Sequence, residues 1–205
     1  MFRDRTDAGE RLADVLEAKG VAADIVVAIP RGGLPLGRAV ADRLGAPLDV
    51  IVASKIGAPR NPEFALGAVA EDGAVWLNEV ALDRAAPSEE YLATERERER
   101  AVAAEKAGTY REGDRPDFAG KRVVVVDDGV ATGATMRACL RLVRDDGPSS
   151  LVAAVPVGPP DTLEELESLA DAVISVERPR RFRAVGAHYR NFGQVSDEQA
   201  MSYLA

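Results

Sequence analysis

Two adjacent carboxylates and a loop of small residues stand in the middle of this chain, in an order that could bind a phosphate ester. The stretch from Lys121 to Thr135 reads KRVVVVDDGVATGAT. Its four consecutive valines form an apolar run of strand length, which predicts a buried, parallel strand. Asp127 and Asp128 end that strand, and a loop of small residues follows from Gly129 to Ala134. Because ligands of open α/β sheets bind at the carboxyl ends of strands, this stretch is the first candidate site.

A helix should begin where this loop ends, at Thr135. The apolar residues Met136, Cys139, Leu140 and Val143 have the spacing of one helical face. A helix N-terminus offers unpaired N–H groups and a partial positive charge, both of which suit a phosphate monoester. The expected phosphate-binding residues are therefore the loop and the first helical residue, namely Gly129, Val130, Ala131, Thr132, Gly133, Ala134 and Thr135.

The two carboxylates could serve this ligand in two ways. Asp127 and Asp128 could accept hydrogen bonds from vicinal sugar hydroxyls, or they could approach a metal ion. The alternative is a plain strand–turn–helix in which the pair only caps the turn.

A second loop of the same kind lies near the start of the chain. Ile25 to Ile29 is an apolar run of strand length, and a helical stripe begins at Leu36. Between them stand Arg31, Gly32 and Gly33, which should form another anion site at a helix N-terminus. The alternative for Arg31 is a solvated loop arginine.

A lysine follows the next predicted strand, at 48–53. Lys55 is one of only four lysines in the chain, and it would place a compact positive charge at the end of that strand. The alternative is an ordinary surface lysine.

These stretches together resemble the type I phosphoribosyltransferases. VVVVDDGVATGAT is similar to the family's binding signature for phosphoribosyl pyrophosphate (PRPP), AIPRGG to its pyrophosphate loop, and SKIG to its basic position. FRDRTDAGERLA and AVGAHYRNFGQVSDEQ resemble a subgroup of uncharacterised predicted phosphoribosyltransferases of bacteria and archaea.

The resemblance implies transfer of 5-phosphoribosyl from PRPP to a nitrogenous acceptor, with release of pyrophosphate. Arg31, Lys55, the loop amides and a Mg²⁺ cofactor would neutralise the leaving group. Asp127 and Asp128 would orient the ribose and hold the metal, directly or through water. A homodimer is usual for the family.

Alternating helices and strands along the chain predict an α/β fold, with a Rossmann-like doubly wound parallel sheet of about five strands. A capping box at Asp7–Glu10 should open the first helix. Further elements are expected as a hairpin at 65–80, a solvated helix at 88–106, and core strands at 151–155 and 172–176. Residues 1–205 should form one phosphoribosyltransferase-like domain, with a core at about 21–176.

The last stretch, about 177–205, is expected to form a small hood together with the N-terminal segment. His188, Tyr189 and Phe192 are candidate acceptor-binding residues there. Alternatively, the aromatic rings only fasten the tail to the body, and His188 is structural or at the surface. The arginines between 178 and 183 are expected to form salt bridges within the hood, rather than to bind a second phosphate or RNA. In the helix at 88–106, Arg96 or Arg100 could instead reach the pyrophosphate.

Composition narrows the class of protein. The net charge of −8, from 26 basic and 34 acidic residues, argues against a broad nucleic-acid surface. The apolar runs are too short to span a membrane, and the N-terminus lacks an apolar signal core, so a soluble cytoplasmic protein is expected. Cys139 is expected to fill the core.

One position departs from the family pattern and leaves the acceptor open. Family members that act on 6-oxopurines usually carry an Asp where this chain has Ala131, so hypoxanthine or guanine is not the expected acceptor. Two other functions compete with transfer: a non-catalytic regulator that binds PRPP or a nucleotide, and a phosphatase on the same cradle. No Ser/His/Asp or Cys/His grouping in the sequence supports the phosphatase.

Overall fold

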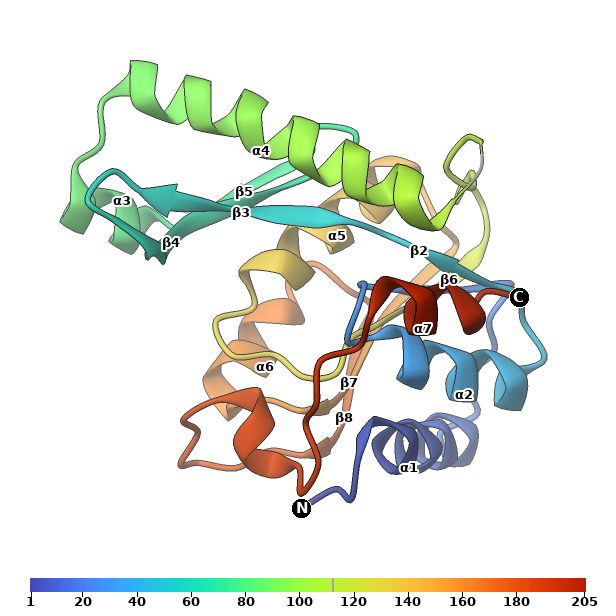
Figure 1. Ribbon diagram of the computed structural model, residues 1–205. Coiled ribbons are helices and arrows are strands. Elements are labelled where there is room, and N and C mark those ends of the chain that lie inside the picture. Colours follow the sequence, from blue (N-terminus) through green and yellow to red (C-terminus); the bar gives the residue numbers. More distant parts are fainter. Residues whose placement is uncertain (112) are drawn as a thin grey trace.

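A five-stranded parallel sheet forms the centre of the computed structural model, which describes residues 1–111 and 113–205, the side chain of Glu63 excepted (Figure 1). The strand order is β2-β1-β6-β7-β8, and every neighbouring pair is parallel. The bounds are β1 Ile25–Ala28, β2 Leu48–Val50, β6 Arg122–Val126, β7 Ser150–Val157 and β8 Ala172–Glu177. This order confirms the predicted doubly wound α/β fold.

Helices cover both faces of the sheet, which explains why β6 is apolar at every position after Arg122. Val124 and Val126 pack in one core cluster with residues of α1 (Arg5–Ala18) and α2 (Leu34–Leu44). Val123 and Val125 pack in another with α5 (Ala134–Asp145) and α6 (Pro160–Leu166). Because side chains alternate along a strand, a strand buried on both faces needs apolar residues at every position.

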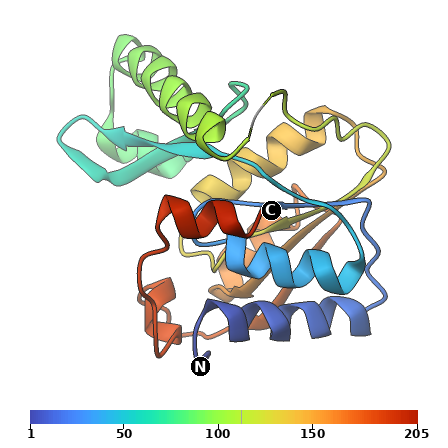
Figure 2. The same ribbon diagram turned by 45° about the vertical axis from the view of Figure 1, so that its right-hand side comes forward.

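A smaller antiparallel sheet extends from the body as an arm (Figures 1 and 2). Its strands run in the order β3-β4-β5, with bounds Ala53–Ala58, Asn61–Ala70 and Val75–Leu77. The long helix α4 (Glu89–Tyr110) packs on β3 and β4, while α5 also contacts all three strands. A short helix, α3 (Glu79–Ala85), connects β5 to α4. The predicted hairpin at 65–80 is therefore confirmed. Along the chain, the arm follows β2 and precedes β6.

The predicted strand at 48–53 was wrong in its extent. The chain leaves the parallel sheet after Val50, and Ala53 already belongs to β3 of the arm. Ile51 and Val52 between them are both buried. The apolar run is thus continuous across the change of sheet, so its pattern does not mark the boundary. Lys55 consequently lies inside β3 and not at the end of a core strand.

The first helix begins earlier than its predicted capping box. Its N-cap is Asp4, whose Oδ1 accepts a hydrogen bond from the Asp7 amide at 2.9 Å. Asp7 in turn accepts from the Arg3 amide at 3.0 Å. The capping bonds therefore lie three residues earlier in the chain, and Glu10 takes no part in them.

Helix α4 is helical as predicted, but it is not uniformly solvated. Glu95 is buried and bonded to Arg98 at 2.8 Å, and Glu99 accepts from the Ser54 hydroxyl at 2.5 Å. The two glutamates are four residues apart, so they share the face that packs on the arm. Arg96 and Arg100 are exposed, and a role for either at the pyrophosphate stays a prediction.

The first residues of the chain lie beside the segment around Tyr189, whereas the C-terminus lies apart from the N-terminus (Figure 1). Phe2 pairs with Tyr189 in a parallel bridge, and its amide donates to the His188 carbonyl at 2.8 Å. Residues 185–188 form a 3₁₀ turn, and a final helix, α7 (Asp197–Ser202), contacts α4. The N-terminal segment therefore packs against the stretch that was predicted to form the hood. No helix within the described residues is long and apolar enough to cross a membrane.

The arginines at 178–183 do not form the predicted salt bridges. In the part of the chain that the structure describes, none of the four lies within 4.0 Å of a carboxylate; Arg178 instead donates to the Ser175 hydroxyl at 2.8 Å. The reason is local, because no acidic residue occurs from 178 to 196.

The packing of α5 gives a first testable prediction. Leu140 is fully buried between the parallel sheet and the arm, so Leu140→Ala should leave a cavity and lower the free energy of unfolding by about 2–5 kcal/mol. Urea denaturation measures this loss. Val102→Ala on the exposed side of α4 is the control, and a loss no larger than the control's would contradict this account of the core.

Candidate active site

The candidate active site lies at the carboxyl ends of β1 and β6, where the order in which the chain adds strands to the sheet reverses. From β1 the chain moves outward to β2, and after the arm it returns to β6 on the other side of β1. Doubly wound sheets open a crevice at such a point. A cavity of about 670 Å³ occupies it, and its lining includes Arg5, Arg31, Gly32, Ser54, Lys55, Glu99, Asp127, Asp128, Thr135 and Phe192.

The two predicted loops are in direct contact in this cavity. A Cβ on Gly32 would lie only 2.1 Å from Asp128 Oδ2, and a Cβ on Gly33 only 2.6 Å from the Ile29 carbonyl oxygen. Both positions therefore require glycine for space. The Pro30–Arg31 peptide bond is cis, and the Arg31 guanidinium lies 3.6 Å from an Asp197 carboxylate oxygen.

The carboxylate pair is partly withdrawn from water. Burial, and then the charge of Asp128, raise the pKa of Asp127 well above its usual value. Burial also raises the pKa of Asp128, while the neighbouring Arg5 opposes that rise. Asp127 Oδ1 accepts from the Asp128 amide at 2.8 Å, and Asp128 Oδ2 accepts from Arg5 Nε at 2.8 Å.

The loop after the carboxylates forms a second, smaller cavity of about 160 Å³ at the N-terminus of α5. Residues 129–136 line it together with Lys55, Asp127 and Val185. Gly133 is the N-cap and takes φ of +74°, a left-handed conformation that glycine adopts at little cost.

Two side chains outside this cavity bind the carbonyl oxygens of the loop. The Thr162 hydroxyl donates to the Ala131 carbonyl at 2.9 Å, and Arg137 Nη1 donates to the Thr132 carbonyl at 2.5 Å. Arg137 is itself buried, with its guanidinium 4.5 Å from the Trp76 ring and an ion pair to Glu165. Since the two carbonyl oxygens already accept hydrogen bonds on the side away from the cavity, the loop can present its amide groups to an anion.

Lys55 connects the two cavities. Together with Asp127 and Thr135 it lines both of them. Although β3 is a strand of the arm, it places Lys55 at the wall of both cavities.

The three aromatic candidates from the end of the chain differ in their positions. Phe192 lines the larger cavity. Tyr189 is buried, its ring packs between those of Phe2 and Phe192, and its hydroxyl donates to the Asp128 carbonyl at 2.6 Å. His188 stacks on Phe182 with ring centroids 5.1 Å apart and lines neither cavity. Of the three, only Phe192 lines either of these two cavities.

Several residues of this site escaped the sequence analysis. Arg5, Ser54 and Glu99 line the larger cavity, and Arg137 holds the loop behind the smaller one. Arg137 gave no clear signal, because it is not one of the residues of the apolar stripe, and its burial is seen only in the structure. Arg5 gave none, since it reaches the site only by the packing of α1 against the end of the chain.

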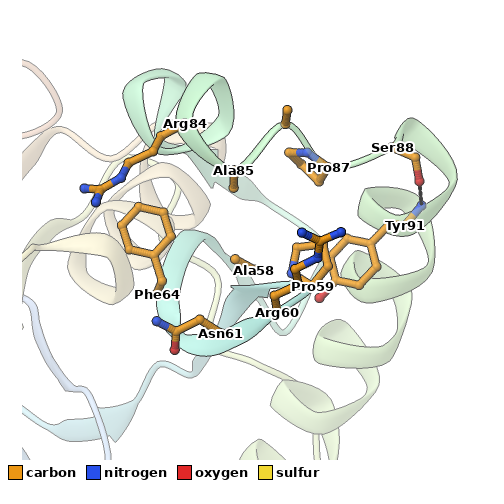
Figure 3. A pocket seen from close by; sticks show the side chains of 11 residues that line it. Ala58, Pro59, Arg60, Asn61, Phe64, Arg84, Ala85, Pro87, Ser88 and Tyr91 are labelled. Carbon is orange, nitrogen blue, oxygen red and sulfur yellow. Dashed lines mark hydrogen bonds between the residues drawn. The ribbon is translucent and has the colours of Figure 1, made fainter.

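A third cavity, of about 650 Å³, lies at the tip of the β3–β4 hairpin and is separate from this site (Figure 3). Phe64, Tyr91, Arg60 and Arg84 are among its lining residues, and Tyr91 projects from α4. None of the residues predicted for the active site lines it.

No group of three or more His, Cys, Asp or Glu side chains is arranged to hold a metal within the described residues. Asp127 and Asp128 do offer hard oxygen donors, and each uses one carboxylate oxygen in the hydrogen bonds given above. Such a pair suits Mg²⁺, which commonly binds through one or two carboxylates together with the phosphates of a substrate.

Comparison with known proteins agrees with this geometry. Residues 5–190 match the phosphoribosyl transferase domain family. The chain is 40% identical over 210 residues to the protein named Putative phosphoribosyl transferase Rv0571c of Mycobacterium tuberculosis, covering 100% of this chain and 46% of that protein. The chain thus spans about half the length of the curated relatives it matches.

Two solved structures are also similar. TT1426 from Thermus thermophilus has a TM-score of 0.83 and 45% identity, covering 100% of this chain and 97% of that one. A purine phosphoribosyltransferase from Pyrococcus horikoshii has a TM-score of 0.50 and 18% identity, covering 92% and 90%, which shows a shared fold alone.

The fold and the site define a doubly wound α/β protein with a crevice at the switch point of its parallel sheet. The match over residues 5–190 makes the assignment more specific: the chain belongs to the phosphoribosyl transferase domain family. The resemblance seen in the sequence is confirmed.

The raised pKa of Asp127 predicts a dependence of stability on pH. A carboxyl whose folded pKa lies above its unfolded value destabilises the fold as pH rises from the unfolded pKa through the folded one. Asp127→Asn should therefore raise the free energy of unfolding at pH 7, and this gain should disappear below about pH 4, the unfolded pKa of an aspartate.

Urea denaturation between pH 3.5 and 8 measures this difference between wild type and variant. Asp117→Asn, in a surface turn, is the control. Equal stability of Asp127→Asn and wild type at every pH would show that the burial of Asp127 carries no cost.

Proposed function

We propose that this protein is a PRPP-dependent phosphoribosyltransferase, which transfers 5-phosphoribosyl to a nitrogenous small-molecule acceptor and releases pyrophosphate. The observation that carries the proposal is the convergence of the two loops. A carboxylate pair, a helix N-terminus and a second anion loop meet at one cavity, and a basic side chain lines it. These are the parts needed to hold a ribose that bears a phosphate at one end and a diphosphate at the other.

The smaller cavity would take the 5-phosphate. Its volume of about 160 Å³ suits a compact group, and the amides of residues 131–135 with the Thr132 and Thr135 hydroxyls would donate to the phosphate oxygens. The contacts of Thr162 and Arg137 to the loop carbonyls support this assignment, because they keep the loop in one conformation.

The ribose would lie over the carboxylate pair. Asp127 and Asp128 would accept hydrogen bonds from its vicinal hydroxyls and hold the ring while its C1–O bond to pyrophosphate breaks and the acceptor nitrogen bonds to C1. Such a centre passes through an oxocarbenium-like transition state. The electron pair of the broken bond leaves with pyrophosphate.

Charge on the leaving group would be met by Arg31, Lys55 and the amides of Gly32 and Gly33. Preorganised donors of this kind stabilise charge that develops in the transition state. Arg31 and Lys55 both line the larger cavity. Asp127 and Asp128 would hold Mg²⁺, directly or through water, and the bound ion would supply further charge neutralisation.

The acceptor would enter beside the C-terminal segment. Phe192, Gln194 and Val195 line the same cavity as the carboxylates, on the side of the predicted hood. This supports a hood made of residues from about 177 onward together with the N-terminal segment. Tyr189 would act by supporting Phe192 and Asp128, while acceptor contact by His188, a homodimer and a cytoplasmic location stay predictions.

Removal of one ribose partner tests the binding step. Asp128→Asn should weaken PRPP binding by roughly 10- to 100-fold, because a charge-assisted hydrogen bond is worth about 1.5–3 kcal/mol. Isothermal titration calorimetry with PRPP and Mg²⁺ measures the affinity, and Asp146→Asn, remote from the cavity, is the control. An unchanged dissociation constant would remove Asp128 from the ribose site.

The transfer itself is tested by pyrophosphate release from PRPP and Mg²⁺, against a panel of nucleobases, small amines and carboxamides. Release should depend on one acceptor class and should disappear in the double variant Asp127→Asn/Asp128→Asn. Folded protein that binds PRPP but releases no pyrophosphate with any acceptor would favour the alternative, a non-catalytic PRPP- or nucleotide-binding regulator.

A further inference from the structure

One guanidinium joins two parts of the candidate site through three contacts. Arg5, at the start of α1, donates through Nε to Asp128 Oδ2 at 2.8 Å and through Nη1 to the Gly193 carbonyl at 2.6 Å. Its Cζ lies 3.8 Å from the centre of the Phe192 ring. The residue therefore contacts the carboxylate pair, the backbone of the C-terminal segment and the aromatic ring beside the cavity at once.

This arrangement is well enclosed. The side chains of Arg5 and Asp128 are each only 13% exposed, so their ion pair is screened much less than one at the surface. On the far side of Asp128, the Tyr189 hydroxyl holds its carbonyl oxygen at 2.6 Å. The C-terminal segment thus contacts Asp128 in two ways. Tyr189 donates directly to its carbonyl oxygen, and Arg5 links its carboxylate to Gly193.

The geometry also limits where the Asp128 carboxylate can go. Gly32 leaves space for no more than a hydrogen atom beside Oδ2, and Arg5 holds that same oxygen. The carboxylate is therefore fixed in one orientation through Oδ2, which leaves Oδ1 for a ligand. A carboxylate without this partner could rotate about its Cα–Cβ and Cβ–Cγ bonds, and would lose rotamer entropy on binding.

We propose that Arg5 is a positioning residue that orients Asp128 for the ribose and couples PRPP binding to the order of the segment at 190–196, which borders the acceptor side of the cavity. This inference rests on the proposed function. It implies that the acceptor site is completed when the ribose is bound, since the group that holds Asp128 also holds Gly193 and Phe192.

Three variants test this proposal: Arg5→Ala, Arg5→Lys and Arg11→Ala. Arg11 is a matched control, because it also belongs to α1, lies over an aromatic ring (4.6 Å from Phe2) and faces a carboxylate (3.7 Å from Glu177), but does not contact Asp128. Arg5→Lys keeps the charge and loses the planar fork, so it separates charge from geometry and serves if Arg5→Ala folds poorly.

Hydrogen exchange of the backbone amides at 190–196 reads the coupling. In the free protein, Arg5→Ala should speed their exchange about tenfold, while Arg11→Ala leaves it unchanged. In wild type, PRPP with Mg²⁺ should slow exchange of this segment; in Arg5→Ala that protection should be lost, and the dissociation constant for PRPP should rise roughly 10- to 100-fold. Arg5→Lys should fall between Arg5→Ala and wild type.

The outcomes separate this inference from the proposed function. If wild type binds PRPP and Asp128→Asn binds it weakly, but Arg5→Ala binds it as wild type does, Arg5 does not position Asp128 and the inference fails alone. Exchange at 190–196 that matches the Arg11→Ala control would also overturn it. Wild type that binds no PRPP would overturn the proposed function and the ligand coupling with it, while the exchange of the free variants would still decide whether Arg5 anchors the segment.

Discussion

The whole site depends on the parallel pairing of β1 with β6. Ala28 lies opposite Val126, and the Ile29 amide donates to the Val126 carbonyl at 2.9 Å, so both strands end at the same level. The loops that follow them are 94 residues apart at Gly33 and Asp127, yet they touch, because the backbone of Gly33 passes directly beside Asp127. Without that register, the carboxylates and the anion loop would not share a cavity.

This arrangement buries two negative charges, which is unfavourable. Two adjacent carboxylates stand where burial raises the pKa of both, and nearby cations offset only part of it. The positive charges of Arg5 and Lys55 both lower the pKa of Asp127. Arg5 belongs to α1 and Lys55 to the arm. The elements outside the parallel sheet therefore stabilise the site electrostatically as well as enclosing it.

The strand β6, the loop after it and helix α5 could be predicted almost completely from the sequence. A run of valines, two aspartates, small residues and an apolar stripe are local patterns, and each matches one element: β6, the loop and α5. The end of β2 and the first helix were less predictable. The chain stays apolar through Ile51 and Val52 as it changes sheets, and Asp4 caps α1 without the Glu that a capping box should show.

The sequence by itself determined the fold class, the positions of the two small-residue loops and the family, because strand periodicity, helix stripes and small-residue loops are patterns of neighbouring residues. Only the tertiary structure decided which distant side chains complete the site. Arg5 meets Asp128 across 123 positions, Ser54 meets Glu99 across 45, and His188 turns to Phe182, away from both cavities. Such contacts follow from how α1, α4 and the C-terminal segment pack on the sheets, and packing between distant segments leaves no local pattern.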